Sequence, residues 1–440
     1  MGRLIGSIKE GVGFIPNSGF LSDDKIQTLE FGEYAIVLAN SKKTLELLME
    51  CFHPEDAVTI YSVALIHFVQ GFSYMKDIKK YYDMSYLSLK FPCLKLGYTR
   101  LSKLYANLGR RQGPVLLLEQ KLVDASSRQI AVDGHVLGSV SSENDLACKG
   151  YKFQKIGESQ MNLLMAYDVN THIPLFSRIY EGGSPDKVSV QDFLYQVELK
   201  DMLFIVDSGF YSTENLELFQ TNGSSYIIPL AKNLKICKKA VSHLEMNGRF
   251  MYQKGKKAAA IEYKDELIDG HRVLCFRDLN EAAAEQANYL RYLQQGKKNY
   301  TEERFLELKD FMGLYVLQTS LLEATAEEIF QLYKMRWTIE TYYNYFKNRT
   351  DCRSLYQQDY YKVQGLAFVM LVSALIHQEF ADACKVLKGK SIQDCLLEAR
   401  MLKANKQMGI WTVSNCSQKH RDLLKALNTE PKIEGHWLHT

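Results

Sequence analysis

Two short apolar runs, each closed by an aspartate, set the narrowest limits on what this chain can fold into. Residues 130–133 read Ile-Ala-Val-Asp and are followed by Gly134, and residues 202–207 read Met-Leu-Phe-Ile-Val-Asp. Short continuous apolar runs rich in β-branched residues indicate strands that are buried on both faces. Ligands and catalytic groups collect at the carboxyl ends of strands in α/β sheets. We therefore expect Asp133 and Asp207 to end two strands of one α/β sheet.

The segments around these runs alternate between strand and helix patterns. Residues 163–167 and 174–180 flank a turn at 168–171 and predict a β-hairpin. Further along the chain, helix patterns at 188–199 and 213–220 alternate with strand patterns at 226–228 and 313–318. Strands that alternate with helices are typical of an α/β core.

Length and composition exclude several other classes of protein. A chain of 440 residues that is 46% hydrophobic and 24% charged predicts more than one domain, each with a sizeable core. The longest apolar run, residues 365–376, falls short of the roughly 20 residues of a membrane span. The nine cysteines include no Cys-x-x-Cys pair, which favours a reducing cytoplasm over a disulfide framework or a cysteine zinc site.

A third acid lies on a segment that we predict to be one long helix. The sequence Thr-x-x-Glu at 325–328 is a capping box and predicts a helix running to about residue 348. Four chemically active side chains fall within an arc of roughly 60° on this helix: Tyr333, Arg336, Glu340 and Lys347. A solvated face with an Arg336–Glu340 ion pair is the alternative. Trp337, Tyr343 and Phe346 crowd the same helix and favour more burial than a solvated helix has, and we expect Trp337 mainly to pack the helix onto the sheet.

The spacing Tyr-x2-Arg-x3-Glu-x6-Lys, after the two strand-end aspartates, resembles the DDE transposases of bacterial insertion sequences. It is most similar to the group defined by this Tyr-Arg-Glu-Lys signature, and the likeness covers residues 125–380. The matching flanking text is Asp133-Gly134-His135, Asp207-Ser208-Gly209-Phe210-Tyr211-Ser212 and Arg336-Trp337-Thr338-Ile339-Glu340. The resemblance implies an RNase H-like catalytic core, a mixed α/β sheet flanked by helices, interrupted by a largely β insertion.

Combined with the patterns along the chain, the resemblance predicts five regions. Residues 1–125 are expected to form a helical N-terminal DNA-binding region, 126–231 the first part of the catalytic domain, 232–312 the insertion subdomain, 313–380 the second part of the catalytic domain, and 381–440 a helical C-terminal region. The stretch between Asp207 and Glu340 is too long for a simple connection, so an inserted unit is expected there.

The resemblance also implies the chemistry of the site. Asp133, Asp207 and Glu340 would hold two Mg²⁺ or Mn²⁺ ions, while Tyr333, Arg336 and Lys347 would contact phosphates near the transferred strand end. The implied partners are double-stranded DNA, as inverted repeats at the element's ends and as target, and a second copy of the chain on paired ends. The implied location is the bacterial cytoplasm, at the nucleoid, without a membrane.

The net charge of only +3 hides two strongly basic segments. Residues 76–111 carry nine basic and two acidic side chains, interleaved with tyrosines, and residues 232–257 carry eight basic and one acidic. Such segments suit phosphate contacts, although a solvated face is the alternative for each. The candidate DNA contacts in the first segment are Lys79, Lys80, Arg100, Lys103, Arg110 and Arg111.

Three functions share these features. The first is a transposase that binds, cleaves and joins the ends of its element, and the second is a DNA endonuclease without strand transfer. The third is a domesticated or decayed copy that binds DNA as a repressor, an alternative that Ser208 keeps open because relatives commonly carry arginine there. Beside the triad, we expect His135 to pack or to lie near DNA rather than bind metal, and Asp186 to cap a helix or act as a fourth acid.

Overall fold

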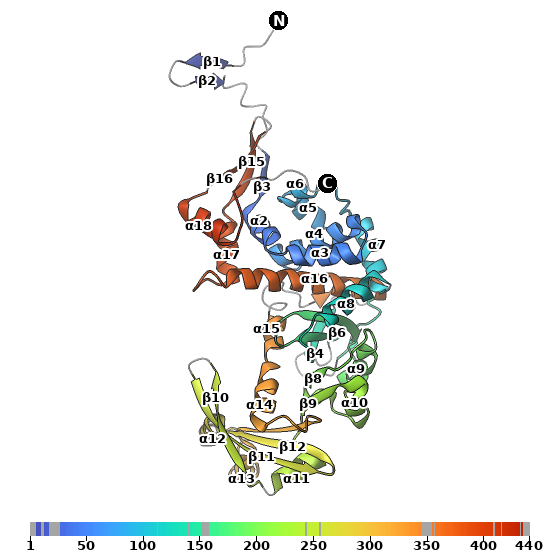
Figure 1. Cartoon of the computed structure of the whole chain (residues 1–440), viewed down its shortest axis with the longest axis vertical. Helices are drawn as coiled ribbons and strands as arrows, with labels where there is room; N and C mark the ends of the chain where they lie inside the picture. The colour runs from blue at the N-terminus through green and yellow to red at the C-terminus, as the bar shows by residue number, and fades with distance from the viewer. Residues whose placement is uncertain are drawn as a thin grey trace. The chain divides into compact units, whose positions relative to one another are not determined.

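The computed structural model describes most of the chain and divides it into two compact units (Figure 1). The described residues are 6–9, 13–16, 27–111, 113–139, 141, 143–150, 158–242, 244–254, 257–344, 354–355, 357–407, 410–414, 416–431 and 433. One unit, called here the helical unit, comprises Met1–Pro114, Arg349–Cys352 and Phe368–Thr440. The other, called here the sheet unit, comprises Val115–Asn348 and Arg353–Ala367 and contains both strand-end aspartates.

The sheet unit is built on a mixed sheet flanked by helices. Its central strands are β4 (Gln129–Ser139), β6 (Ser159–Asp168), β7 (Pro174–Glu181), β8 (Leu203–Val206) and β9 (Ser225–Pro229). Along the sheet they follow the order β7-β6-β4-β8-β9, with β4, β8 and β9 parallel and β6 antiparallel to both of its neighbours. Two short strands, β5 (Cys148–Lys149) and β14 (Ser354–Leu355), pair with β6 and β4 respectively. The α/β sheet predicted from the two apolar runs is therefore present.

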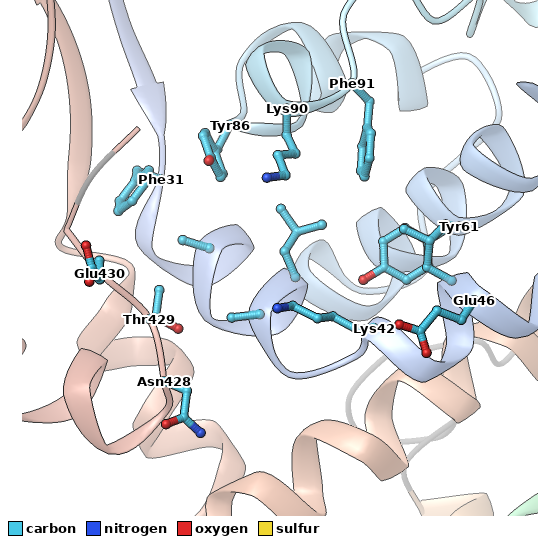
Figure 2. Close-up of a pocket in the computed structure, with 14 residues that line it drawn as sticks. Phe31, Lys42, Glu46, Tyr61, Tyr86, Lys90, Phe91, Asn428, Thr429 and Glu430 are labelled. Carbon is cyan, nitrogen blue, oxygen red and sulfur yellow. The ribbon is translucent and has the colours of Figure 1, made fainter. Parts of the chain in front are cut away.

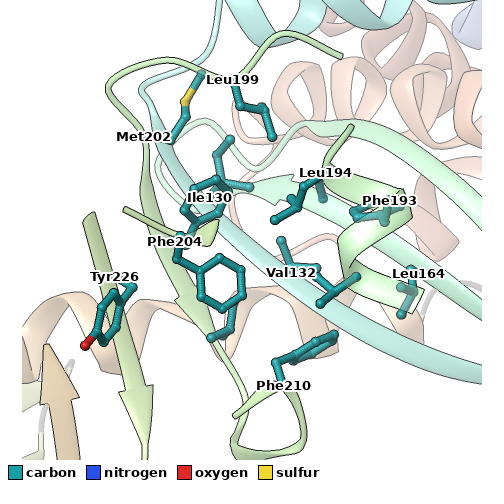
Figure 3. Packing of buried hydrophobic residues seen from close by; sticks show 14 of the residues in the cluster. Ile130, Val132, Leu164, Phe193, Leu194, Leu199, Met202, Phe204, Phe210 and Tyr226 are labelled. Carbon is teal, nitrogen blue, oxygen red and sulfur yellow. The ribbon is translucent and has the colours of Figure 1, made fainter. Parts of the chain in front are cut away.

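The apolar runs form the core on one face of this sheet (Figure 3). Ile130 and Val132 of β4 lie beside Phe204 of β8, and all three are buried. Helix α9 (Asp186–Leu194) covers them, and its Phe193 ring stacks on Phe176 of β7 with centroids 4.6 Å apart. Burying each such side chain stabilises the fold by about 1.5–3 kcal/mol, which fixes the strands on which Asp133 and Asp207 are carried.

The exposed backbone of β7 is closed by a side chain rather than by another strand. Gln364, on helix α16 (Tyr360–Cys384), donates to the Ile179 carbonyl at 2.6 Å and accepts from the Ile179 N–H at 3.2 Å. This pair of hydrogen bonds replaces those of a missing neighbour strand and leaves less of the edge open to pairing with other chains.

Residues 232–312 extend the same sheet. Strands β10 (Gly248–Lys254), β11 (Lys257–Ile268) and β12 (His271–Asp278) form an antiparallel series that joins β9 through β13 (Leu314–Thr319). Helices α11 (Lys235–Ser242), α12 (Leu279–Gln294) and α13 (Glu302–Leu308) lie in the same stretch. The segment that the resemblance implied to be largely β thus contains as many described α-helices as described strands.

The single long helix predicted from residue 325 is interrupted. Helix α14 (Ala326–Met335) begins with the predicted capping box of Thr325 and Glu328, but a second helix, α15 (Thr338–Asn344), starts after a two-residue break. The Thr338 hydroxyl donates to the Met335 carbonyl at 2.8 Å, and that carbonyl is the acceptor that the Ile339 N–H would use in an α-helix. The Ile339 N–H bonds instead three residues back, to Arg336. The predicted 60° arc assumed one continuous helix, and the helix is not continuous beyond Arg336.

The helical unit also differs from the sequence expectation at both ends. Its core helices include α2 (Gly32–Ala39), α3 (Lys42–Cys51), α4 (Pro54–Gln70), α5 (Ile78–Asp83), α6 (Leu87–Lys90), α7 (Tyr98–Gly109), α17 (Ile392–Ala399) and α18 (Gln418–Ala426). The unit also contains a hairpin of β1 (Gly6–Lys9) and β2 (Gly13–Pro16) and a sheet of β3 (Gln27–Glu30), β15 (Lys403–Gln407) and β16 (Ile410–Ser414). Because β3 pairs with a strand more than 370 residues away, local periodicity could not reveal it.

One described helix, α16, is long and apolar enough to meet the length and composition criteria for a membrane span. Within its most apolar 18-residue window, 83% of the residues are buried inside the protein. Burial to this extent is typical of a core helix, since a membrane span would present its apolar side chains outward to lipid.

The core of the helical unit contains a histidine that titrates unusually. Burial lowers the pKa of His67 to about 4, and its ring accepts from the Ser73 N–H at 3.1 Å. The unfolded chain takes up this proton near pH 6.5, whereas the folded chain does so only near pH 4. Protonation therefore favours unfolding, and the free energy of unfolding should fall by roughly 2–3 kcal/mol between these pH values.

We expect His67→Gln to flatten this acid dependence. The measurement is chemical denaturation from pH 7 to pH 4, with the exposed His53→Gln as the matched control. An unchanged slope in His67→Gln would show that other groups cause the acid sensitivity.

Candidate active site

The two aspartates lie side by side on neighbouring parallel strands. Pairing of β4 with β8 runs from Gln129↔Leu203 to Val132↔Val206, and an aspartate follows the last paired residue in both segments. Asp133 and Asp207 therefore occupy equivalent positions on strands about 4.8 Å apart and project from the same face. Asp207 follows the end of β8 as predicted, but Asp133 does not end its strand, because β4 continues to Ser139 through its pairing with β6.

Each aspartate is oriented by the backbone that follows it. The N–H of Gly134 donates to Asp133 Oδ1 at 2.8 Å, and the N–H of Ser208 donates to Asp207 Oδ1 at 2.8 Å. In both residues, Oδ1 accepts a hydrogen bond from the backbone N–H of the next residue, so the two carboxylates are oriented by the same local contact.

Helix α14 brings a tyrosine and an arginine to these acids. Arg336 Nη1 lies 4.0 Å from Asp133 Oδ2, and the guanidinium lies 5.9 Å from the centre of the Tyr333 ring. Burial raises the pKa of Tyr333, the charges of Asp207 and Glu340 raise it further, and Arg336 lowers it. The charges of Asp207, Glu340 and Arg336 therefore all act on the Tyr333 phenol.

The Arg336 side chain is incompletely satisfied at this position. It is only 9% exposed, and its Nε has no hydrogen-bond partner among the described residues. A buried donor without a partner costs about 1–3 kcal/mol. A guanidinium with an unused donor is suited to bind an anionic group of a ligand.

The remaining members of the predicted helix stripe are placed differently. Glu340 is exposed on α15, and Lys347 lies outside the described residues. Trp337 was expected to pack the helix onto the sheet, but it is 45% exposed and lies in the break between α14 and α15. It lines a pocket of about 390 Å³ together with Tyr252 and Lys334, a feature that the sequence did not reveal.

Two further side chains lie near Asp133. His135 follows it by two residues on β4, and Asp186 lies beside Gly134 of the same strand. The His135 ring stacks on Tyr343 of α15, with centroids 5.0 Å apart and planes 29° apart. Asp186 opens α9, and its Oδ2 would lie 3.0 Å from a Cβ at position 134. Gly134 therefore leaves the space that this carboxylate occupies, while the helix cap itself is Pro185 rather than Asp186.

The donor chemistry at these strands suits a hard divalent cation. Asp133 and Asp207 offer carboxylate oxygens, the ligands that Mg²⁺ and Mn²⁺ prefer. Within the described ranges, no three acidic, histidine or cysteine side chains converge closely enough to hold an ion unaided. Two carboxylates are therefore aligned on the sheet, and Glu340 is exposed on α15.

The candidate DNA contacts of residues 76–111 lie in the helical unit, and several are engaged within the protein. Lys79 pairs with Asp83 and Lys80 with Asp77, while Arg100 lies 3.4 Å from Asp56. The Arg110 guanidinium donates to Asn107 at 2.9 Å. Arg111 is only 8% exposed, so little of its side chain is accessible, whereas Lys103 is exposed on α7.

A second cavity, of about 550 Å³, lies within the helical unit (Figure 2). The buried rings of Phe31, Tyr61 and Phe91 form part of its wall, and Lys42 and Lys90 extend toward the same space. The cavity contains none of the three acids. Its residues come from segments far apart in the sequence, so no sequence pattern could have revealed it.

Comparison with known proteins assigns the chain to a family. A family model described as "Transposase DDE domain" matches residues 124–376, more than half of the chain. The chain belongs to the DDE transposase family. The matched range contains all three candidate acids of this DDE transposase and most of its sheet unit.

Searches of other proteins add less. No curated protein matches the chain. Among solved structures, a piggyBac transposase synaptic complex with hairpin DNA is similar at a TM-score of 0.43 and 11% sequence identity, covering 83% of this chain and 77% of that chain.

Proposed function

We propose that this DDE transposase belongs to the Tyr-Arg-Glu-Lys group and moves a bacterial insertion sequence, whose ends it binds, cleaves and joins to a target. The observation that carries the proposal is the equivalent register of Asp133 and Asp207 on β4 and β8. Arg336 lies 4.0 Å from Asp133. The charges of Asp207 and Glu340 act on the Tyr333 phenol. Membership of the transposase family supports DNA as the substrate.

We further propose that the sheet unit is an RNase H-like catalytic domain with an insertion at residues 232–312. In its favour, an antiparallel meander of three strands is followed by two parallel strands, in the order β7-β6-β4-β8-β9. The strands of residues 232–312 add to the β9 side of this sheet through β13, away from the meander. An insertion placed there lengthens the sheet without separating β4 from β8.

The mechanism follows from which groups the protein fixes. Asp133, Asp207 and Glu340 would hold two divalent ions, which when bound activate the attacking oxygen and stabilise the leaving 3′-oxygen at phosphorus. The backbone N–H groups of residues 134 and 208 orient the two aspartates before DNA arrives. Arg336 presents a buried guanidinium for a bidentate grip on a phosphate, and burial keeps the Tyr333 phenol protonated as a hydrogen-bond donor. Lys347 would add a point charge to the same strand.

We propose double-stranded DNA at the element's ends and at the target as the partner, bound by a homodimer in the bacterial cytoplasm at the nucleoid. Exposed cations of the helical unit would then track the DNA backbone. Lys103 is the clearest candidate because it is exposed on α7. Its neighbour Arg100, by contrast, already lies against acids of the same unit. Lys79, Lys80 and Arg110 would first have to leave their partners.

Lys103→Ala is expected to weaken binding to all duplexes alike and to lower the slope of log affinity against log salt by about 1. The measurement is fluorescence anisotropy from about 50 to about 200 mM salt. Lys385→Ala, which removes an exposed cation already paired with Asp382, serves as the control. An unchanged salt slope in Lys103→Ala would remove this residue from the DNA surface.

One assay distinguishes the transposase from its alternatives. The protein is incubated with Mg²⁺ or Mn²⁺ and a duplex that carries the inverted repeats flanking its gene. The proposed function predicts 3′-end cleavage followed by joined products. Cleavage without joining would favour an endonuclease, and binding without cleavage would favour a repressor.

A further inference from the structure

The position of Glu340 is not fixed by the helix that precedes it. The N–H groups of Arg336, Trp337, Ile339 and Glu340 each bond three residues back rather than four. Such a stretch inside a helical segment often marks a hinge. Because α15 has only seven residues and follows this stretch, its direction depends on what it contacts.

Tyr343 supplies that contact. It lies on α15 three residues after Glu340, and residues at this spacing are neighbours on a helix surface. Its hydroxyl donates to the main-chain carbonyl of Asp133 at 2.8 Å, and its ring stacks on His135. The side chain is only 5% exposed although Glu340 is open to solvent, so α15 is held to β4 on the Tyr343 side.

The carbonyl that Tyr343 reaches stands where the parallel neighbour of β4 ends. In the described part of the chain, β8 pairs with β4 as far as Val132, and β14 pairs with it again only at Gly138 and Ser139. The Asp133 carbonyl lies between these two pairings. Its hydrogen bond to Tyr343 therefore links α15 to the same residue whose side chain is the first acid.

The Tyr343 hydroxyl keeps its proton under ordinary conditions. Burial raises its pKa well above the usual value, and the charges of Asp133 and Asp186 raise it further. The protonated hydroxyl is the donor of the 2.8 Å hydrogen bond to the Asp133 carbonyl.

We propose that Tyr343 is a positioning residue that fixes Glu340 relative to Asp133 and so completes the third side of the metal site. This inference rests on the proposed function. Tyr343 does not contact the reacting atoms. It sets the docking of α15, and the hinge at residues 336–337 allows Glu340 to depart from the two strand acids when that docking is lost.

The test is Tyr343→Phe, which deletes the hydroxyl and keeps the ring that stacks on His135. The Mn²⁺ concentration that half-saturates 3′-end cleavage is expected to rise about 3- to 10-fold, the range expected when one hydrogen bond is lost. Electron paramagnetic resonance of Mn²⁺ bound to the protein on its end duplex should show the same loss of affinity. Binding of the duplex without divalent ions and the Tm should change little.

Tyr289→Phe is the matched control. Tyr289 is also a buried tyrosine of the sheet unit, and its hydroxyl donates to the Thr301 carbonyl at 3.1 Å. We expect this variant to keep the wild-type Mn²⁺ dependence. A merely structural role for Tyr343 would lower the Tm and leave the Mn²⁺ midpoint unchanged, and that outcome would overturn the inference.

The two levels of the proposal fail in different ways. If the wild-type protein neither cleaves its end duplex nor binds Mn²⁺, the proposed function falls and this inference falls with it. If the wild-type protein does both and Tyr343→Phe matches it at every Mn²⁺ concentration, only the positioning role of Tyr343 is wrong.

Discussion

Glu340→Gln is expected to lower the rate of 3′-end cleavage by at least about 10³-fold, the scale on which a single charge acts in phosphoryl transfer. The substitution keeps the size and hydrogen-bonding capacity of the side chain but removes its charge, and therefore the third anionic ligand of the proposed site. Because Glu340 is exposed, the free energy of unfolding should change by less than about 0.5 kcal/mol. Single-turnover cleavage measures the first effect, and anisotropy with the end duplex should show that DNA affinity is retained.

Glu327→Gln provides the control for this experiment. Glu327 is an exposed glutamate of α14, and it accepts a hydrogen bond from Gln331 at 3.1 Å away from the acids. We expect it to cleave at the wild-type rate. Retained cleavage in Glu340→Gln, with the control also active, would contradict the assignment of the third acid to residue 340.

Arg336→Met is expected to separate activity from stability. Arg336 is buried beside Asp133 with an Nε that has no partner in the described structure, so the folded protein carries the cost of an unsatisfied donor. Methionine fills similar space without that cost. The free energy of unfolding should therefore change by less than about 2 kcal/mol, because leaving Asp133 without this counter-ion opposes the gain from removing the unsatisfied donor.

Cleavage by Arg336→Met should nevertheless fall by about 10²- to 10³-fold, since the buried guanidinium would no longer meet the phosphate. Arg336→Lys should recover little of the rate, because a point charge cannot replace a planar bidentate donor. Urea denaturation and single-turnover cleavage measure the two effects. A variant that is destabilised by more than about 2 kcal/mol yet cleaves normally would show that Arg336 serves the fold rather than the reaction.

The strands that carry the first two acids could be predicted because their signals are local. The apolar runs before Asp133 and Asp207 have the composition of buried strands, and both form strands. The end of β4 could not be predicted in the same way. Gly134 and His135 continue the strand because they pair with Leu164 and Leu163 of β6, a tertiary contact that overrides their own weak preference.

The third element shows where sequence reasoning succeeds in part. The capping box at Thr325 and Glu328 set the start of α14 correctly, because the cap is a local hydrogen-bond exchange. The break at Arg336 and Trp337 was missed because helical periodicity assumes one uninterrupted ladder. Thr338 was the available signal, since its hydroxyl competes for the Met335 carbonyl. The docking of Tyr343 on Asp133 joins residues 210 positions apart and carries no sequence signal.

The central claim is that Asp133, Asp207 and Glu340 together bind divalent cations at the DNA strand that is cut. The most direct measurement is a structure of the protein on its end duplex with Ca²⁺, which occupies such sites without supporting rapid cleavage. The account predicts cations about 2.3–2.6 Å from carboxylate oxygens of Asp133 and Asp207, with Glu340 completing the shell and Arg336 on the neighbouring phosphate. Cations bound elsewhere, with the duplex phosphates away from β4 and β8, would contradict it.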